Sequence, residues 1–109
     1  MSDGSFVVVL CTMPADVSAA EAMARRLVEK RLAACVNLIP QVRSIYRWND
    51  DVETADECQL LIKTKKSGID ALEAFLAKNH PFDVPEVVIL QATASSAYGA
   101  WVQASVSSD

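Results

Sequence analysis

Apolar positions fall into continuous runs, which predict strands, and into runs with helical spacing. Residues 6–12 form an unbroken run rich in β-branched side chains, which is typical of a central strand buried on both faces. A second run, 33–39, stops at Pro40, which lacks the backbone N–H that a sheet ladder needs, so we expect a β-bulge or kink there. A further buried strand is predicted over residues 86–93.

Helical spacing predicts two amphipathic helices and a short third one. Ser18 and Glu21 have the spacing of a capping box, and apolar residues then recur every three or four positions to about residue 31. A second cap at Ser67 and Gly68 precedes a helix that ends near residue 78. Two prolines make the segment after this helix irregular, and a short amphipathic helix is predicted from Ser95 to about Ser105.

Two long extended segments, 42–48 and 52–63, predict a β-hairpin because turn-forming residues separate them at 49–51. A three-residue loop would place opposite charges across the strands, pairing Arg47 with Glu53 and Arg43 with Glu57. A hairpin this long overhangs a small domain and exposes strand edges and the aromatic residues Tyr46 and Trp48.

The order strand, helix, strand, strand, helix, strand predicts an α+β fold of the ferredoxin-like βαββαβ type. Its four-stranded antiparallel sheet carries two helices on one face, and a short C-terminal helix follows. Two helices cover only one face, yet the central strand offers apolar side chains to both. We therefore expect oligomerisation to cover the second face. The length of 109 residues suits one domain spanning 1–109.

Charge and composition exclude several function classes. The net charge of −4 argues against nucleic acid or an anionic membrane surface as the main partner. No apolar run is long enough for a membrane helix, and residues 1–5 lack the positive start of a secretory signal, so we expect a soluble, cytoplasmic protein. The odd number of cysteines in apolar contexts favours reduced thiols over disulfides: Cys11, Cys35 and Cys58.

Five short segments occur in a characteristic order: LAACVN at 32–37, SIYRW at 44–48, IKT at 62–64, HPFDVPE at 80–86, and Tyr98 with Trp101. In this order and spacing they resemble the successive signatures of the CutA divalent-cation tolerance family, over nearly the whole chain. The resemblance implies a ferredoxin-like protomer in a homotrimer, a cytoplasmic location, and tolerance to copper and other divalent metals. It implies no known reaction, so we expect a metal-binding protein rather than an enzyme.

The same resemblance indicates a copper site. The family's proposed ligands are a cysteine at the end of the first strand and two consecutive histidines before a proline. Here they correspond to Cys11 and His80, with Asn79 at the position of the first histidine. Thiolate and imidazole are suitable copper ligands. The alternative is structural: Cys11 as a small buried side chain, and His80 as a group that caps the preceding helix.

A second functional hypothesis is a trimeric scaffold for small-ligand signalling or assembly that resembles PII-type proteins, with incidental metal binding. A cleft between subunits near the hairpin would then bind small anions through basic side chains, with Arg43, Lys63 and Lys65 as candidates. The replacement of a histidine by Asn79 favours this hypothesis. Three carboxylates are expected to be solvated or paired across strands, with binding of a hard metal as a second interpretation: Asp56, Glu57 and Glu86.

Overall fold

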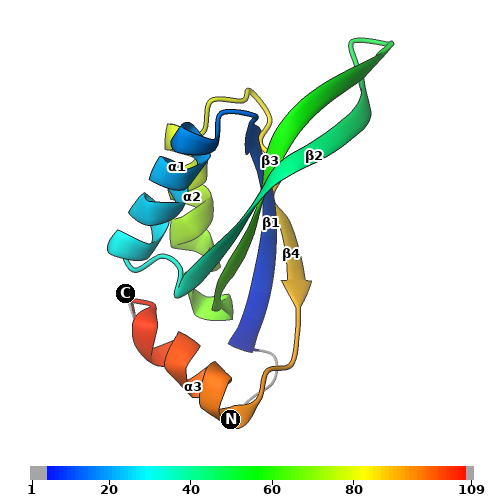
Figure 1. Ribbon diagram of the computed structural model, residues 1–109. Helices are drawn as coiled ribbons and strands as arrows, with labels where there is room; N and C mark the ends of the chain where they lie inside the picture. The colour runs from blue at the N-terminus through cyan, green and yellow to red at the C-terminus, as the bar shows by residue number, and fades with distance from the viewer. Residues whose placement is uncertain (1–4, 108–109) are drawn as a thin grey trace.

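The computed structural model describes residues 5–107, and Figure 1 shows the arrangement of its elements. Residues 1–4, on which the expected lack of a secretory signal mostly rests, lie outside this range. The elements in chain order are β1 (Phe6–Pro14), α1 (Val17–Glu29), β2 (Cys35–Trp48), β3 (Asp51–Lys65), the 3₁₀ turn η2 (Lys66–Gly68), α2 (Ile69–Asn79), β4 (Val88–Gln91) and α3 (Ser96–Ser105).

The strands form one antiparallel sheet in the order β2-β3-β1-β4, with α1 and α2 on the same side of it (Figure 1). This arrangement confirms the predicted ferredoxin-like βαββαβ fold and the central place of β1. Helix α3 lies at the end of the molecule opposite the hairpin tip. Among residues 5–107, no helix combines the length and apolarity required to cross a membrane.

The core lies between the sheet and the two helices. Alternate residues of β1 point to the helices and are fully or almost fully buried, because successive side chains of a strand face opposite sides. Leu27 of α1 and Leu72 and Leu76 of α2 pack into the same cluster. Each such leucine contributes roughly 1.5–3 kcal/mol through burial, so this layer holds β1 and the end of α2 in fixed positions.

The start of α1 differs from the prediction. Asp16, rather than Ser18, is the N-cap: its Oδ1 accepts a hydrogen bond of 3.1 Å from the backbone N–H of Ala19. The predicted capping box at Ser18 and Glu21 is therefore wrong, because the helix already begins at Val17. The predicted side-chain cap of α2 is also absent from the described residues, since the turn η2 leads directly into that helix.

The hairpin of β2 and β3 is confirmed, and its register differs by one residue from the predicted one. Trp48 pairs with Asp51, so the loop has two residues, Asn49 and Asp50, with φ angles of 51° and 68°. Positive φ at both positions is typical of a type I′ turn, whose twist matches that of the flanking strands. Arg43 consequently faces Asp56 instead of Glu57, and Arg47 faces Val52 instead of Glu53. The predicted bulge at Pro40 is confirmed by a register shift between Ile39 and Val42.

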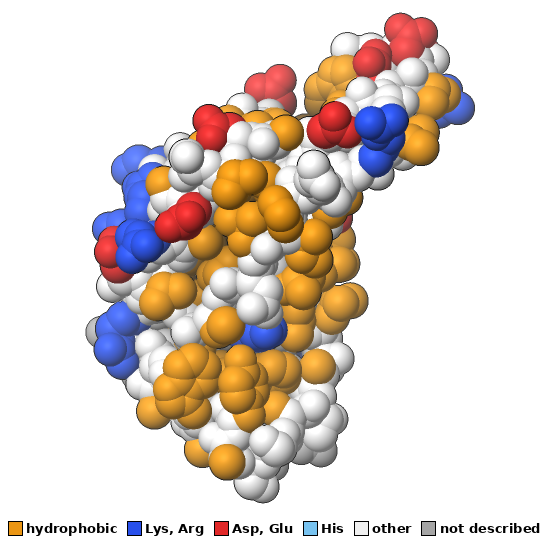
Figure 2. Space-filling model, in the orientation of Figure 1, with side chains coloured by type: hydrophobic (Ala, Val, Ile, Leu, Met, Phe, Trp, Pro, Cys, Tyr) orange, Lys and Arg blue, Asp and Glu red, His pale blue; other side chains and the backbone are white. Residues whose placement is uncertain are grey.

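Strand β4 is shorter than predicted, and it is exposed rather than buried. Only Val88–Gln91 pair with β1, and all four are exposed because β4 forms an edge of the sheet. The second face is partly covered by α3 and the residue that follows it, which pack Val102 and Val106 against Phe6 and Ala34. Figure 2 shows hydrophobic side chains gathered over α3 and over the middle of this view. An apolar surface thus remains open on the single chain.

Candidate functional site

The two predicted metal ligands meet at one backbone oxygen. Cys11 lies on the helix-covered face of β1 and is fully buried in the core. His80 follows the last residue of α2 in an extended conformation, which turns its ring towards the end of β1. The carbonyl oxygen of Thr12 lies 2.7 Å from Nε2 of His80 and 3.8 Å from Sγ of Cys11. The fold therefore brings together two residues that are far apart in the sequence.

His80 also has a structural role, because both of its ring nitrogens have partners. Nδ1 accepts a hydrogen bond of 3.1 Å from the backbone N–H of Phe82, so Nε2 carries the proton and donates to the carbonyl of Thr12. The ring also lies 4.9 Å from that of Phe82, between centroids. Through these two hydrogen bonds, His80 connects the irregular segment after α2 to the end of β1. A metal ion at either nitrogen has to replace one of these hydrogen bonds.

Cys11 is held in its neutral form. Burial, assisted by the negative charge of Glu86, raises the pKa of the Cys11 thiol from 9.0 to about 12. A thiol of this kind is a poor nucleophile, and a metal ion has to displace its proton before the sulfur can bind. Cys35 and Cys58 are also free thiols, as the sequence predicts.

Asn79, at the position of a histidine in the family motif, points away from this site. Its Oδ1 accepts a hydrogen bond of 3.2 Å from Arg26, and its Nδ2 donates to the carbonyl of Phe75 at 2.9 Å. The guanidinium of Arg26 lies over the ring of Phe75 as well. Asn79 thus links α2 to α1. Between residues 5 and 107, no three His, Cys, Asp or Glu side chains are grouped closely enough to hold a metal ion. The donors fit copper in kind, and the described part of the chain brings only two of them together, Cys11 and His80.

A cavity of about 650 Å³ opens between the hairpin and the segment that follows His80. Residues of β2 and β3 form one wall, and the segment from Pro81 to Glu86 forms the other. The lining residues are Thr12, Ser44, Tyr46, Trp48, Glu57, Pro81, Phe82, Asp83, Val84, Pro85 and Glu86. Tyr46 and Trp48 were expected to be exposed on the hairpin, whereas no sequence pattern indicated that Phe82 and Asp83 would line a cavity with them.

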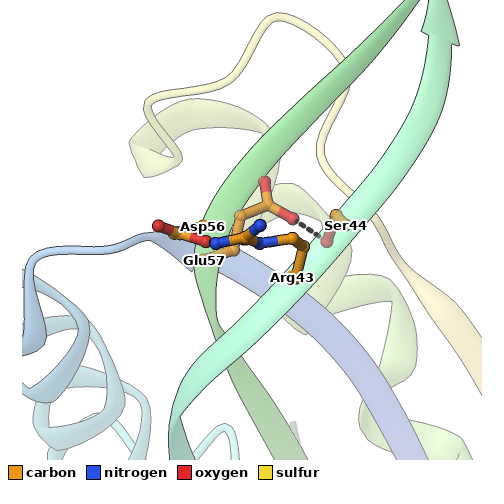
Figure 3. A network of polar contacts seen from close by, with 4 residues as sticks. All are labelled: Arg43, Ser44, Asp56 and Glu57. Atoms are coloured by element: carbon orange, nitrogen blue, oxygen red, sulfur yellow. Dashed lines mark hydrogen bonds and ion pairs between the residues drawn. The ribbon is translucent and has the colours of Figure 1, made fainter.

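The lining of the cavity is acidic, and the basic side chains expected in an anion-binding cleft between subunits are not part of it. Arg43, Lys63 and Lys65 do not line it. Arg43 instead forms an ion pair of 3.1 Å with Asp56, as the corrected register requires (Figure 3). Lys63 donates a hydrogen bond to Asn37.

Two of the carboxylates in the cavity are held by neutral hydrogen-bond donors. Glu57 is only 8% exposed, and its Oε1 accepts a hydrogen bond of 2.5 Å from the hydroxyl of Ser44 on the neighbouring strand (Figure 3). Glu86 accepts a hydrogen bond of 3.2 Å from Nε2 of Gln59. Neither carboxylate is in an ion pair with any residue of the described chain. These hydrogen bonds orient the two carboxylates, and no positively charged side chain of the described residues neutralises them.

Comparison with known proteins agrees with this geometry. The model of the CutA1 divalent ion tolerance protein family matches residues 7–105. A divalent-cation tolerance protein CutA from Pectobacterium atrosepticum is 44% identical over 101 residues, which cover 92% of this chain and 91% of that protein. The mouse protein CutA is 47% identical over 87 residues. These residues are 80% of this chain and 49% of the mouse protein, so the chain spans about half the length of that relative.

Solved structures give the same result for the fold. The divalent cation tolerance protein Cut A1 of Thermus thermophilus superimposes with a TM-score of 0.88 at 39% identity, covering 94% of this chain and 99% of that one. A PII-like protein CutA from Nostoc has a TM-score of 0.86 at 31% identity, covering 93% of this chain and 97% of the other.

Proposed function

Because the chain belongs to the CutA1 divalent ion tolerance family, we propose that it acts in divalent-cation tolerance by binding copper, with Cys11 and His80 as ligands. The observation that supports this proposal is their common contact with the carbonyl of Thr12, since a soft sulfur and an imidazole both reach the same backbone oxygen. The carboxylate of Glu86 acts on the same thiol and adds a negative charge that favours a bound cation. The function is binding, with no catalytic step.

Copper binding at this place has a structural consequence. Copper bound here would displace the thiol proton of Cys11, which would pass to water, and would take the place of one hydrogen bond of His80, either the one with Thr12 or the one with Phe82. Loss of such a bond loosens the segment that begins at residue 80. The proposal therefore couples metal binding to the position of the wall of the cavity, which the same segment forms.

The experiment is a calorimetric titration of the fully reduced chain with Cu(I) without oxygen, beside Cys11→Ser and His80→Gln variants. We expect saturable binding that each substitution weakens by at least tenfold, equivalent to about 1.4 kcal/mol. Cys35→Ser, which changes a half-buried thiol elsewhere in the sheet, serves as the matched control and should bind normally. Equal affinity in all four proteins would reject Cys11 and His80 as ligands.

We also propose a cytoplasmic homotrimer. The exposed apolar side chains of β4 and the second face of the sheet support association, because within the described chain β4 has no cover and α3 covers only part of that face. Free thiols at Cys11, Cys35 and Cys58 support a reducing compartment. The PII-like relative from Nostoc keeps the scaffold hypothesis as the second candidate, and the cavity beside the hairpin is the observation that favours it.

A further inference from the structure

We propose that the cavity between the hairpin and the segment 81–86 binds a small organic cation: an amine or guanidinium attached to an apolar body. Its volume of about 650 Å³ is within the range of small-molecule sites. This inference rests on the lining of the cavity and does not require copper at Cys11 and His80.

The first argument is charge. Three carboxylates, those of Glu57, Asp83 and Glu86, line the cavity, and no lysine, arginine or histidine does. The ion pairs of residues 5–107 are Arg25–Glu21 and Arg43–Asp56, so none of the three is neutralised within the described chain. Low-dielectric walls strengthen the field of such charges and attract a cation. A small anion would meet repulsion from all three.

The second argument is the aromatic lining. Tyr46 and Trp48 on β2 face the same cavity as Phe82 from the opposite wall. The faces of aromatic rings attract ammonium and guanidinium groups, and their surfaces also contact an apolar body. A carboxylate beside an aromatic ring is therefore complementary to an organic cation at both of its ends.

The third argument separates an organic cation from a bare metal ion. A hard metal such as Ca²⁺ needs six or more oxygen ligands close to one point. Within the described part of the chain, no three acidic, cysteine or histidine side chains are grouped in that way. Carboxylates distributed along the cavity suit a longer ligand that pairs its charge with one of them. The fixed orientations of Glu57, through Ser44, and Glu86, through Gln59, supply preorganised acceptors.

The test is a calorimetric titration of the full chain at neutral pH with phenethylamine, which is a cation, and with 3-phenylpropionate, an anion of similar shape. We expect saturable binding of the amine, weakened by added salt, and no saturable binding of the anion. Equal binding of both probes, or no saturable binding of the amine, would overturn the proposal. A cavity that is filled by a second copy of the chain would give the latter result.

Two charge-removing variants test whether the amine binds in the cavity. Glu86→Gln keeps the shape of the side chain and removes its charge, so the affinity for phenethylamine should fall by about tenfold. Glu73→Gln, on an exposed position of α2, makes the same change in net charge away from the cavity and should leave the affinity unchanged. An equal loss of affinity in the two variants would show that amine binding depends only on the net charge of the chain, which overturns the proposed site. The chemical shift of the Trp48 indole N–H provides a second readout, because the amine should perturb it before that of Trp101, which does not line the cavity.

Discussion

At the scale of single residues, His80 is a candidate copper ligand and also connects the segment after α2 to the end of β1. It is buried at 9% exposure and satisfies the backbone of Thr12 and Phe82 at the same time. His80→Ala leaves a carbonyl and an N–H without these partners, so we expect a loss of roughly 1–3 kcal/mol in the free energy of unfolding. Urea denaturation measures this loss, with Lys78→Ala on the exposed face of α2 as a control that should cost far less. Equal stabilities would show that the ring holds nothing in place.

The raised pKa of Cys11 predicts that the free energy of unfolding falls as the pH rises above about 9. Its folded pKa of about 12 lies above the ordinary 9.0, so the unfolded chain loses the thiol proton first as the pH rises. The stabilising effect of the neutral thiol is complete below pH 9 and is lost towards pH 12. Between about pH 8 and about pH 10, the free energy of unfolding should fall by about 1 kcal/mol more in the natural chain than in Cys11→Ala. Parallel pH profiles of the two proteins would contradict the raised pKa.

Sequence patterns indicated these two residues but not their environment. The family motif identified Cys11 and His80. The structural alternative for Cys11, a small buried side chain, is confirmed. The alternative for His80 is wrong in its partners, because the ring bonds to the backbone of Thr12 and Phe82 and not to a carbonyl of the preceding helix. The contact with Thr12 depends on how α2 ends above β1, which no local pattern contains. The acidic cavity was missed for the same reason: Glu57 and Glu86 come from segments whose juxtaposition is a tertiary property.

At the scale of elements, the turn between β2 and β3 decides the register of the hairpin. Asp50 has a φ of 68°, which asparagine, aspartate and glycine adopt readily and β-branched residues do not. Asp50→Val should therefore destabilise the hairpin by roughly 1–2 kcal/mol, whereas Asp50→Gly should not. Amide hydrogen exchange of residues 44–56 measures the effect, since the hairpin can open locally. Equal protection in both variants would reject the two-residue turn.

The strands and helices themselves were largely predictable, because hydrophobic periodicity is set by the faces they bury. The errors have physical causes. The expected charge pairs led to a three-residue loop in the prediction. The twist of the strands favours the two-residue turn instead. In the resulting register Arg43 forms its ion pair with Asp56 rather than with Glu57. Apolar composition predicted a buried β4, although an edge strand with the same composition is exposed in a single chain. Its exposure raises the question of what covers it.

At the scale of the whole molecule, the proposed trimer answers that question. Leu90 is 45% exposed on β4 and would enter the interface. We expect light scattering to report three chains per particle at micromolar concentration, and Leu90→Lys to shift the equilibrium towards smaller species because burying a charge is unfavourable. Ala77→Lys, on the exposed side of α2, is the control and should leave the mass unchanged. A monomeric mass for the natural chain would contradict the trimer.

The central place of β1 also determines when the chain can fold during its synthesis. β1 is made first, yet both of its neighbours, β3 and β4, are translated later, and β4 ends only at Gln91. At roughly 5–20 residues per second, the nascent β1 waits several seconds with an apolar surface and two unpaired edges. The β2–β3 hairpin, whose contacts are local, can form in the meantime and serve as a template for β1. β1 is therefore synthesised first but completes its pairing last. A ribosome-bound chain should become protease-resistant only after β4 has emerged.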